Sequence, residues 1–267
     1  MNVIDLAWWE LAIAASMVVA LAITSTLARL NVGKPILIAA ARTVIQLSLI
    51  GLVLEALFAV GSFHWVALMA TVMLLVAGRE VMARQKHRLT GGWAFGIGTV
   101  SMFISGFTVT ILTLTVVIGP DPWYTPQYAI PLLGMLLGNT MTGVALSLDR
   151  LTEAVWRQRA VIENRLMLGQ SWQDAIGDFR REAMRSGMMP MINSMAAAGI
   201  VSLPGMMTGQ ILGGSPPSVA VKYQILVMFT ITVGSGFGAI VAVSAGSRRL
   251  FDERERLRID RLSSARA

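Results

Sequence analysis

The chain has 267 residues, carries a formal net charge of +7 and contains no cysteine, which excludes disulfides and cysteine-based metal sites. Charged residues make up only 14% of it, little more than half of the roughly 25% that is usual in a soluble domain. Together with a mean hydropathy of +0.65, this composition argues against a water-soluble globule and indicates an integral membrane protein.

Seven apolar segments are long enough to cross about 30 Å of hydrocarbon as helices, which takes roughly 20 residues each. We therefore expect an all-α polytopic membrane protein in which residues 1–267 form a single transmembrane domain. The third segment is short, and Pro204-Gly205 interrupts the sixth. In chain order the segments are residues 8–28, 36–58, 62–78, 92–118, 128–148, 188–212 and 221–245.

The basic residues predict the orientation of these spans. The start has no positive n-region, so the first span is a permanent helix and not a signal peptide. Of the 22 Lys and Arg residues, 20 fall in segments 29–35, 79–91, 149–187 and 246–267. Because cytoplasmic loops carry the excess of Lys and Arg, we expect the N-terminus outside and the C-terminus in the cytoplasm. The basic tail, 246–267, is then attracted to anionic membrane lipid, and the positive charge needs no nucleic-acid partner.

Residues 149–187 are too long for a simple connection and predict a cytoplasmic helical segment. The first helix continues from the fifth span and ends at Gly169, a typical C-cap glycine. A capping box at Ser171 then begins a second helix. Trp172, Ile176 and Phe179 form an apolar stripe along it. This stripe has three possible partners: the membrane surface, the chain's own spans, or another protein.

Polar side chains at membrane depth have two interpretations each. Arg42 and Gln46 share one helix face, either reaching to the headgroups or anchoring the helix internally. Mid-span amides and hydroxyls bond between helices or line a substrate path. The break at Pro204-Gly205 is either a simple kink or part of such a path. The candidate path residues are Asn139, Thr140, Asn193, Pro204, Gly205 and Gln210.

Glycines spaced G-x-x-x-G predict close helix contacts, within the bundle or at a dimer seam. The methionines of the sixth span are interpreted as adaptable core filler in preference to Cu(I) ligands. The G-x-x-x-G glycines are Gly134 and Gly138, Gly205, Gly209 and Gly213, and Gly234 and Gly238.

The motifs of several enzyme classes are absent from the sequence. The one Gly-Lys pair, Gly33-Lys34, precedes Pro35 and does not form a P-loop. There is no H-E-x-x-H zinc motif and no dinucleotide-binding loop after a strand. We therefore expect neither an enzyme nor a bound cofactor.

Three strings resemble the membrane subunit of the FetB family of ABC-type permeases, which are linked to iron export and include a plant aluminium-tolerance relative. The first is Val201-Ser-Leu-Pro-Gly-Met-Met-Thr-Gly-Gln-Ile-Leu212, followed by Lys222-Tyr-Gln-Ile225. The others are Arg42-Thr-Val-Ile-Gln-Leu47 and Gly134-Met-Leu-Leu-Gly-Asn-Thr-Met141. The similarity runs from about residue 41 to 229.

The resemblance implies an inner-membrane permease that works with a separate cytoplasmic ABC ATPase and exports iron or another metal. Because such transporters use two ATPases, it also implies a homodimer of permeases. It favours ATPase docking for the stripe Trp172, Ile176 and Phe179. Glu163 and Gly169 share the Glu-to-Gly spacing of the loop through which many ABC importers contact their ATPases.

Other functions remain open from the sequence. They are an ATP-independent channel or secondary transporter, a receptor or scaffold that transports nothing, and export of a nucleotide sugar or another polar metabolite. The spans offer few oxygen or imidazole ligands for a metal ion, so no metal-binding residue is assigned.

Overall fold

The computed structural model describes residues 7–263, and throughout this range the regular structure is helical, with isolated bridges but no strand. The chain divides into two compact units, residues 1–62 with 212–215, and residues 63–211 with 216–267.

The first unit is a helical hairpin of α1 (Trp8–Leu27) and α2 (Gly33–Val60). Glu10 caps α1, since its carboxylate accepts a hydrogen bond from the backbone N–H of Ala7 at 2.8 Å. Gly33 lies so close to α1 that an added Cβ would stand 2.8 Å from the carbonyl oxygen of Ala22. A larger residue would therefore open the hairpin.

The second unit begins with α3 (Phe63–Arg84) and a long helix made of four consecutive parts. Those parts are α4 (Trp93–Met102), η1 (Phe103–Phe107), α5 (Thr108–Leu112) and η2 (Thr113–Ile118), where η1 and η2 are π-helical. The remaining elements are α6 (Pro126–Arg157), α7 (Arg159–Met167), α8 (Trp172–Ala175), α9 (Gly177–Ala197), α10 (Gly205–Leu212), α11 (Pro217–Arg249) and the 3-10 turn η3 (Ile259–Arg261).

Six helices of the described chain are long and apolar enough to cross a membrane: α1, α2, α3, the α4–η2 helix, α6 and α11. The sixth expected span, residues 188–212, is not one helix, because α9 ends at Ala197 and α10 begins at Gly205. Gly199, at φ +82°, lies in the intervening turn, and that left-handed conformation cannot continue a helix. The expected count of seven spans and the orientation of the ends are therefore not confirmed.

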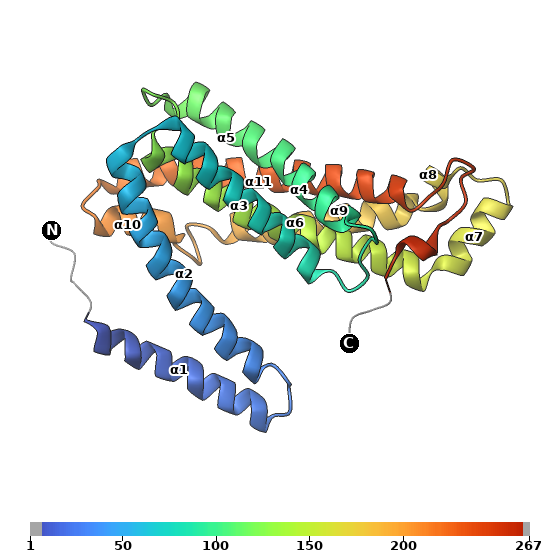
Figure 1. Ribbon diagram of the computed structural model, residues 1–267, viewed down its shortest axis with the longest axis horizontal. Helices are drawn as coiled ribbons and strands as arrows, with labels where there is room; N and C mark the ends of the chain where they lie inside the picture. Colours follow the sequence, from blue (N-terminus) through green and yellow to red (C-terminus); the bar gives the residue numbers. More distant parts are fainter. Residues whose placement is uncertain (1–6, 264–267) are drawn as a thin grey trace. The chain divides into compact units, whose positions relative to one another are not determined.

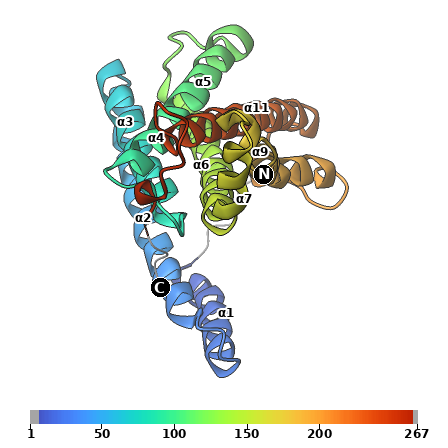
Figure 2. The same cartoon turned by 90° about the vertical axis from the view of Figure 1, so that its right-hand side faces the viewer.

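The core of the second unit is a three-helix contact of α6, α9 and α11 (Figures 1 and 2). An added Cβ on Gly187 would meet the carbonyl oxygen of Gly143 at 2.5 Å, and one on Gly143 would meet the Ser235 side chain at 3.6 Å. Small residues on all three helices thus let the backbones approach closely.

Helices α6 and α11 run in the same direction, because both end beside the connection between α3 and α4. The Trp156 ring near the end of α6 stacks on His87 with centroids 4.6 Å apart. The Arg249 guanidinium at the end of α11 lies 4.5 Å from the Trp93 ring centroid. The chain between them therefore returns in the opposite direction, with α9 packed along both helices and α10 leading to the start of α11.

The two ends of this unit differ in chemistry. We call the end formed by the α3–α4 connection, α7, α8 and residues 250–263 the basic end. At the opposite end, Phe63 at the start of α3 packs against Tyr124 and Trp123, with centroids 5.4 and 6.1 Å apart. Aromatic rings of this kind are typical of a membrane–water interface.

The π-helical segment η1 keeps polar side chains on the buried side of its helix. Ser101, Ser105 and Thr110 are all at least 95% buried. Ser105 donates to the carbonyl of Ser101 at 2.8 Å and Thr110 to that of Gly106 at 2.7 Å. In a regular α-helix nine residues turn through about 900°, which would place Ser101 and Thr110 on opposite faces. The wider turn of η1 brings them to the same side.

Candidate functional site

The basic end begins where α6 extends past the core and the chain turns through α7 and α8. Gln158 separates α6 from α7, and Gly169, at φ +84°, ends the turn after α7. The Ser171 side chain accepts a hydrogen bond from the backbone N–H of Asp174 at 3.3 Å and caps α8. The helix end at Gly169 and the N-cap at Ser171, both predicted from the sequence, are present in the structure.

The apolar stripe of this segment packs on the chain itself. Ile176 is completely buried, and Trp172 and Phe179 pack partly buried against the same core. The Trp172 ring lies 5.5 Å from that of Phe251, and the Arg165 guanidinium donates to the carbonyl of Ala175 at 3.0 Å. The docking expectation needs correction at Ile176, because a fully buried side chain is inaccessible to a partner.

A groove at the basic end leaves other residues accessible. It has a volume of about 730 Å³ and runs between α7 and residues 254–257. Glu163 and Gly169 both line it. Leu168, at the tip beyond α7, is 83% exposed. Leu168 and its neighbour Met167, which is 78% exposed, are accessible to a partner, whereas Ile176 is not.

A second cavity, of about 450 Å³, lies at the break between α9 and α10. We call it the break pocket. Its lining is apolar apart from the buried Gln224, whose side-chain oxygen accepts a hydrogen bond from the backbone N–H of Met207 at 3.3 Å. Gln224 therefore satisfies one of the donors that the start of α10 leaves free. The lining residues are Met195, Ala198, Gly199, Leu203, Pro204, Met207, Val221, Gln224, Ile225, Met228 and Phe229.

The candidate path residues are dispersed, and of them only Pro204 belongs to the lining of the break pocket. Asn139 is half-buried on α6 and donates to the carbonyl of Met135 at 2.8 Å, within its own helix. Thr140 is completely buried, and Asn193 is exposed on α9. Gln210 has a buried side-chain oxygen that accepts no hydrogen bond within the described residues. A path shared by Asn139 and Asn193 remains a prediction.

Gly205 begins α10 directly after Pro204 and is exposed. The expected anchors Arg42 and Gln46 lie exposed on α2, in the first unit. Within residues 7–263, no group of three histidine or acidic side chains could hold a metal ion. The structure therefore assigns no metal ligand in the described spans.

The G-x-x-x-G glycines separate into two groups. Gly234 and Gly238 on α11 form a tight seam with α6, where added Cβ atoms would lie 3.3 and 2.7 Å from Thr140 atoms. An added Cβ on Gly134 would lie 3.1 Å from the Met73 side chain on α3. The others face open space or are exposed: Gly138, Gly205, Gly209 and Gly213.

Comparison with known proteins connects the chain to one family. Residues 8–251 match the model described as "Uncharacterised protein family (UPF0014)". A UPF0014 membrane protein of Synechocystis is 37% identical over 85% of this chain and 87% of its own length. The "Probable iron export permease protein FetB" of Escherichia coli is 30% identical over 95% of each chain.

A plant relative also matches. The protein ALUMINUM SENSITIVE 3 of Arabidopsis thaliana is 32% identical over 80% of this chain and 77% of its own length. No solved structure matches the chain.

Proposed function

Because the chain belongs to the UPF0014 family of multi-pass membrane proteins, we propose that it is the permease subunit of a transporter powered by a separate ABC ATPase. The observation that carries this proposal is the similarity to a probable iron export permease over 95% of the chain. We propose that the substrate is iron or another metal cation and that the direction is export.

The proposed topology has seven crossings in the inner membrane, with the N-terminus outside and the basic end in the cytoplasm. The parallel course of α6 and α11 supports it, because the chain must return between them through α9 and α10. The seventh crossing is then a broken helix, a form tolerated in membranes where the freed backbone lines protein or a cavity. The hydrogen bond from Met207 to Gln224 supplies such a partner.

We place ATPase docking at the groove between α7 and the tail. Glu163 and Gly169 line this groove, and Leu168 projects beside it. An exposed leucine inserted into a partner's pocket excludes water, the usual source of binding energy at such contacts. The two ATPases of an ABC transporter then call for two permease copies, and the open glycine Gly138 is a candidate for their seam.

The test is purification of the full chain in mild detergent with a co-expressed candidate ABC ATPase, followed by reconstitution in proteoliposomes. We expect ATP-dependent movement of Fe²⁺ and stimulated ATP hydrolysis. Leu168→Asp should abolish both while the protein still inserts. Val161→Asp is the matched control, because Val161 is an exposed apolar residue on α7 that lies seven positions before Leu168, away from the tip beside the groove.

Three results would each contradict part of the proposal. Fe²⁺ flux that needs no ATP would favour an ATP-independent channel or secondary transporter. Full ATPase stimulation in the Leu168→Asp variant would remove the docking site from this groove. A mass in detergent with one permease per two ATPases would contradict the homodimer.

A further inference from the structure

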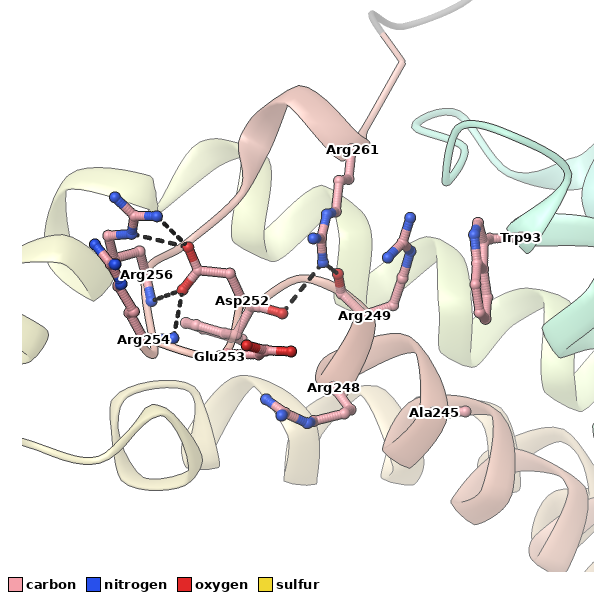
Figure 3. Close-up of a pocket in the computed structure, with 10 residues that line it drawn as sticks. Trp93, Ala245, Arg248, Arg249, Asp252, Glu253, Arg254, Arg256 and Arg261 are labelled. Carbon is pink, nitrogen blue, oxygen red and sulfur yellow. Dashed lines mark hydrogen bonds and ion pairs between the residues drawn. The ribbon is translucent and has the colours of Figure 1, made fainter.

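A cavity of about 830 Å³ at the basic end lies outside the groove and the break pocket (Figure 3). We call it the arginine pocket. Residues 251–261 fold back over the end of α11 and the start of α4 to form it. Its lining contains five arginines and two acidic residues, a net charge of +3. The lining residues are Trp93, Ala245, Arg248, Arg249, Phe251, Asp252, Glu253, Arg254, Arg256 and Arg261.

Two of the five arginines are committed to holding the tail. Arg256 forms an ion pair with Asp252 at 2.7 Å, and the backbone N–H groups of Arg254 and Arg256 donate to the same carboxylate. Arg261 donates to the carbonyls of Arg249 and Phe251 at 2.7 and 3.2 Å. These bonds hold the tail in place as one wall of the pocket. Because Asp252 is paired with Arg256, it does not neutralise the charges of the other arginines.

Arg248 and Arg249 remain able to bind an anion. Their guanidinium groups lie 5.7 Å from the Trp172 ring and 4.5 Å from the Trp93 ring, and Figure 3 shows Arg249 between Arg261 and Trp93. A cation held over a ring face keeps its N–H groups available, because all five point outward in the guanidinium plane. Neither side chain donates a hydrogen bond to an acceptor among the described residues.

The position of the pocket relative to the membrane indicates which kind of anion it can bind. Trp93 is the first residue of α4 and Arg249 the last of α11, and both helices are long and apolar enough to span a membrane. Trp93 is also 47% exposed, as is typical of interfacial tryptophans. The pocket thus opens at the depth where lipid headgroups lie, and the forked donors of arginine match phosphate oxygens.

We propose that the arginine pocket binds the phosphate of an anionic phospholipid headgroup, with Arg249 as its principal ligand and Arg248 adding positive charge to the same lining. Glu253, the remaining acidic residue of the lining, lies on the same turn and favours a site for one phosphate over a larger polyanion. This site would link the lipid charge to the position of the tail, independently of what the protein transports.

The experiment is native mass spectrometry of the delipidated full-length protein, titrated with phosphatidylglycerol, phosphatidylcholine or inorganic phosphate. We expect phosphatidylglycerol to bind at one saturable site and phosphatidylcholine far more weakly. At roughly tenfold for each hydrogen bond to a charged group that is lost, Arg248→Gln with Arg249→Gln should weaken binding about 10- to 100-fold. Arg249→Lys should fall between, since it keeps the charge but loses the fork.

The control is Arg159→Gln, which removes one positive charge from α7, outside the lining of the pocket. All variants should keep the melting temperature and the size-exclusion profile of the parent. The same weakening per charge removed in Arg159→Gln as in the double variant would mean diffuse attraction and overturn the site. Equal binding of phosphatidylcholine would also overturn it. If inorganic phosphate bound as tightly and displaced the lipid, the ligand would be free phosphate and the lipid assignment would fail.

Discussion

Replacing Gly187 with alanine tests the three-helix contact of α6, α9 and α11 most directly. The new Cβ would stand 2.5 Å from the carbonyl oxygen of Gly143 and closer still to the Ser147 hydroxyl. The hydroxyl can be removed, but a backbone oxygen can move only if α9 shifts away from α6. Overpacking of this kind costs about 1–3 kcal/mol, and the higher helix propensity of alanine returns up to ~1 kcal/mol.

The two ranges leave a net loss of stability of about 0–3 kcal/mol. We expect about 1–2 kcal/mol, because a contact with a backbone oxygen cannot be relieved by a side-chain rotation, and this lowers the melting temperature by roughly 2–8 °C for a chain of this size. Tryptophan fluorescence during thermal unfolding in detergent measures it. Gly96→Ala is the matched control, because Gly96 lies inside α4 with no atom within 4 Å of an added Cβ. We expect that variant to melt at the same temperature or slightly higher.

A second substitution separates the two contacts at Gly187. The Ser147 hydroxyl is buried and forms no hydrogen bond within the described residues, so Ser147→Ala alone should change stability little. Combined with Gly187→Ala it should restore part of the loss, since the contact with the Gly143 carbonyl remains. Parent-like melting of Gly187→Ala, or its complete rescue by Ser147→Ala, would refute the close backbone contact.

Three further predictions concern the tail, the break and the path. The backbone N–H and side chain of Arg256 lower the pKa of Asp252 to about 2. The ionised carboxylate therefore stabilises the tail fully above pH 4, and this stabilisation is lost as the pH falls to 2 and the carboxylate is protonated. Pepsin cleavage within residues 250–263 should rise over that window, whereas Asp252→Asn should be cleaved readily throughout. Gln224→Leu removes the acceptor of the Met207 N–H and should lower the melting temperature by about 2–12 °C, for the 1–3 kcal/mol of an unpaired buried donor; no change would mean that water replaces it. Asn139→Ala and Asn193→Ala should each reduce transport with little loss of expression, and unchanged transport rates in both would remove them from the path.

The sequence predicted those elements whose signal is local. Hydrophobic length predicted the six helices that are long and apolar enough to cross a membrane. The positions of Gly169 and Ser171 predicted the turn between α7 and α8, since one residue can stop or cap a helix by itself. The α9–α10 break was anticipated from Pro204-Gly205, although the helix already ends at Ala197. A turn such as that of Gly199 depends on tertiary packing, which the local pattern does not contain.

Features that depend on residues distant in the chain were not predicted. Gly143 and Gly187 lie 44 positions apart and form no G-x-x-x-G spacing, so no sequence pattern indicates that they are in contact. The apolar stripe through Ile176 was recognised, but its partner was not, because amphipathicity shows that a face is covered and not what covers it. The arginine pocket was also not predicted, although the alternating charges of residues 252–261 indicate an ion-paired turn.

The π-helical segment η1 implies that deletion of one residue has different effects at different places in the long α4–η2 helix. Removing one residue between Phe103 and Phe107 would let this segment relax into an ordinary α-helix with its backbone hydrogen bonds intact. Ser101 and Thr110 would then be eight residues apart in a regular helix, a turn of about 800° that leaves them within about 80° of each other, so the Thr110 hydroxyl would stay on the interior side. A single-codon loss in the α-helical part before η1 would instead rotate everything beyond it by about 100° and change which face of half a span meets lipid, while every remaining residue kept its identity.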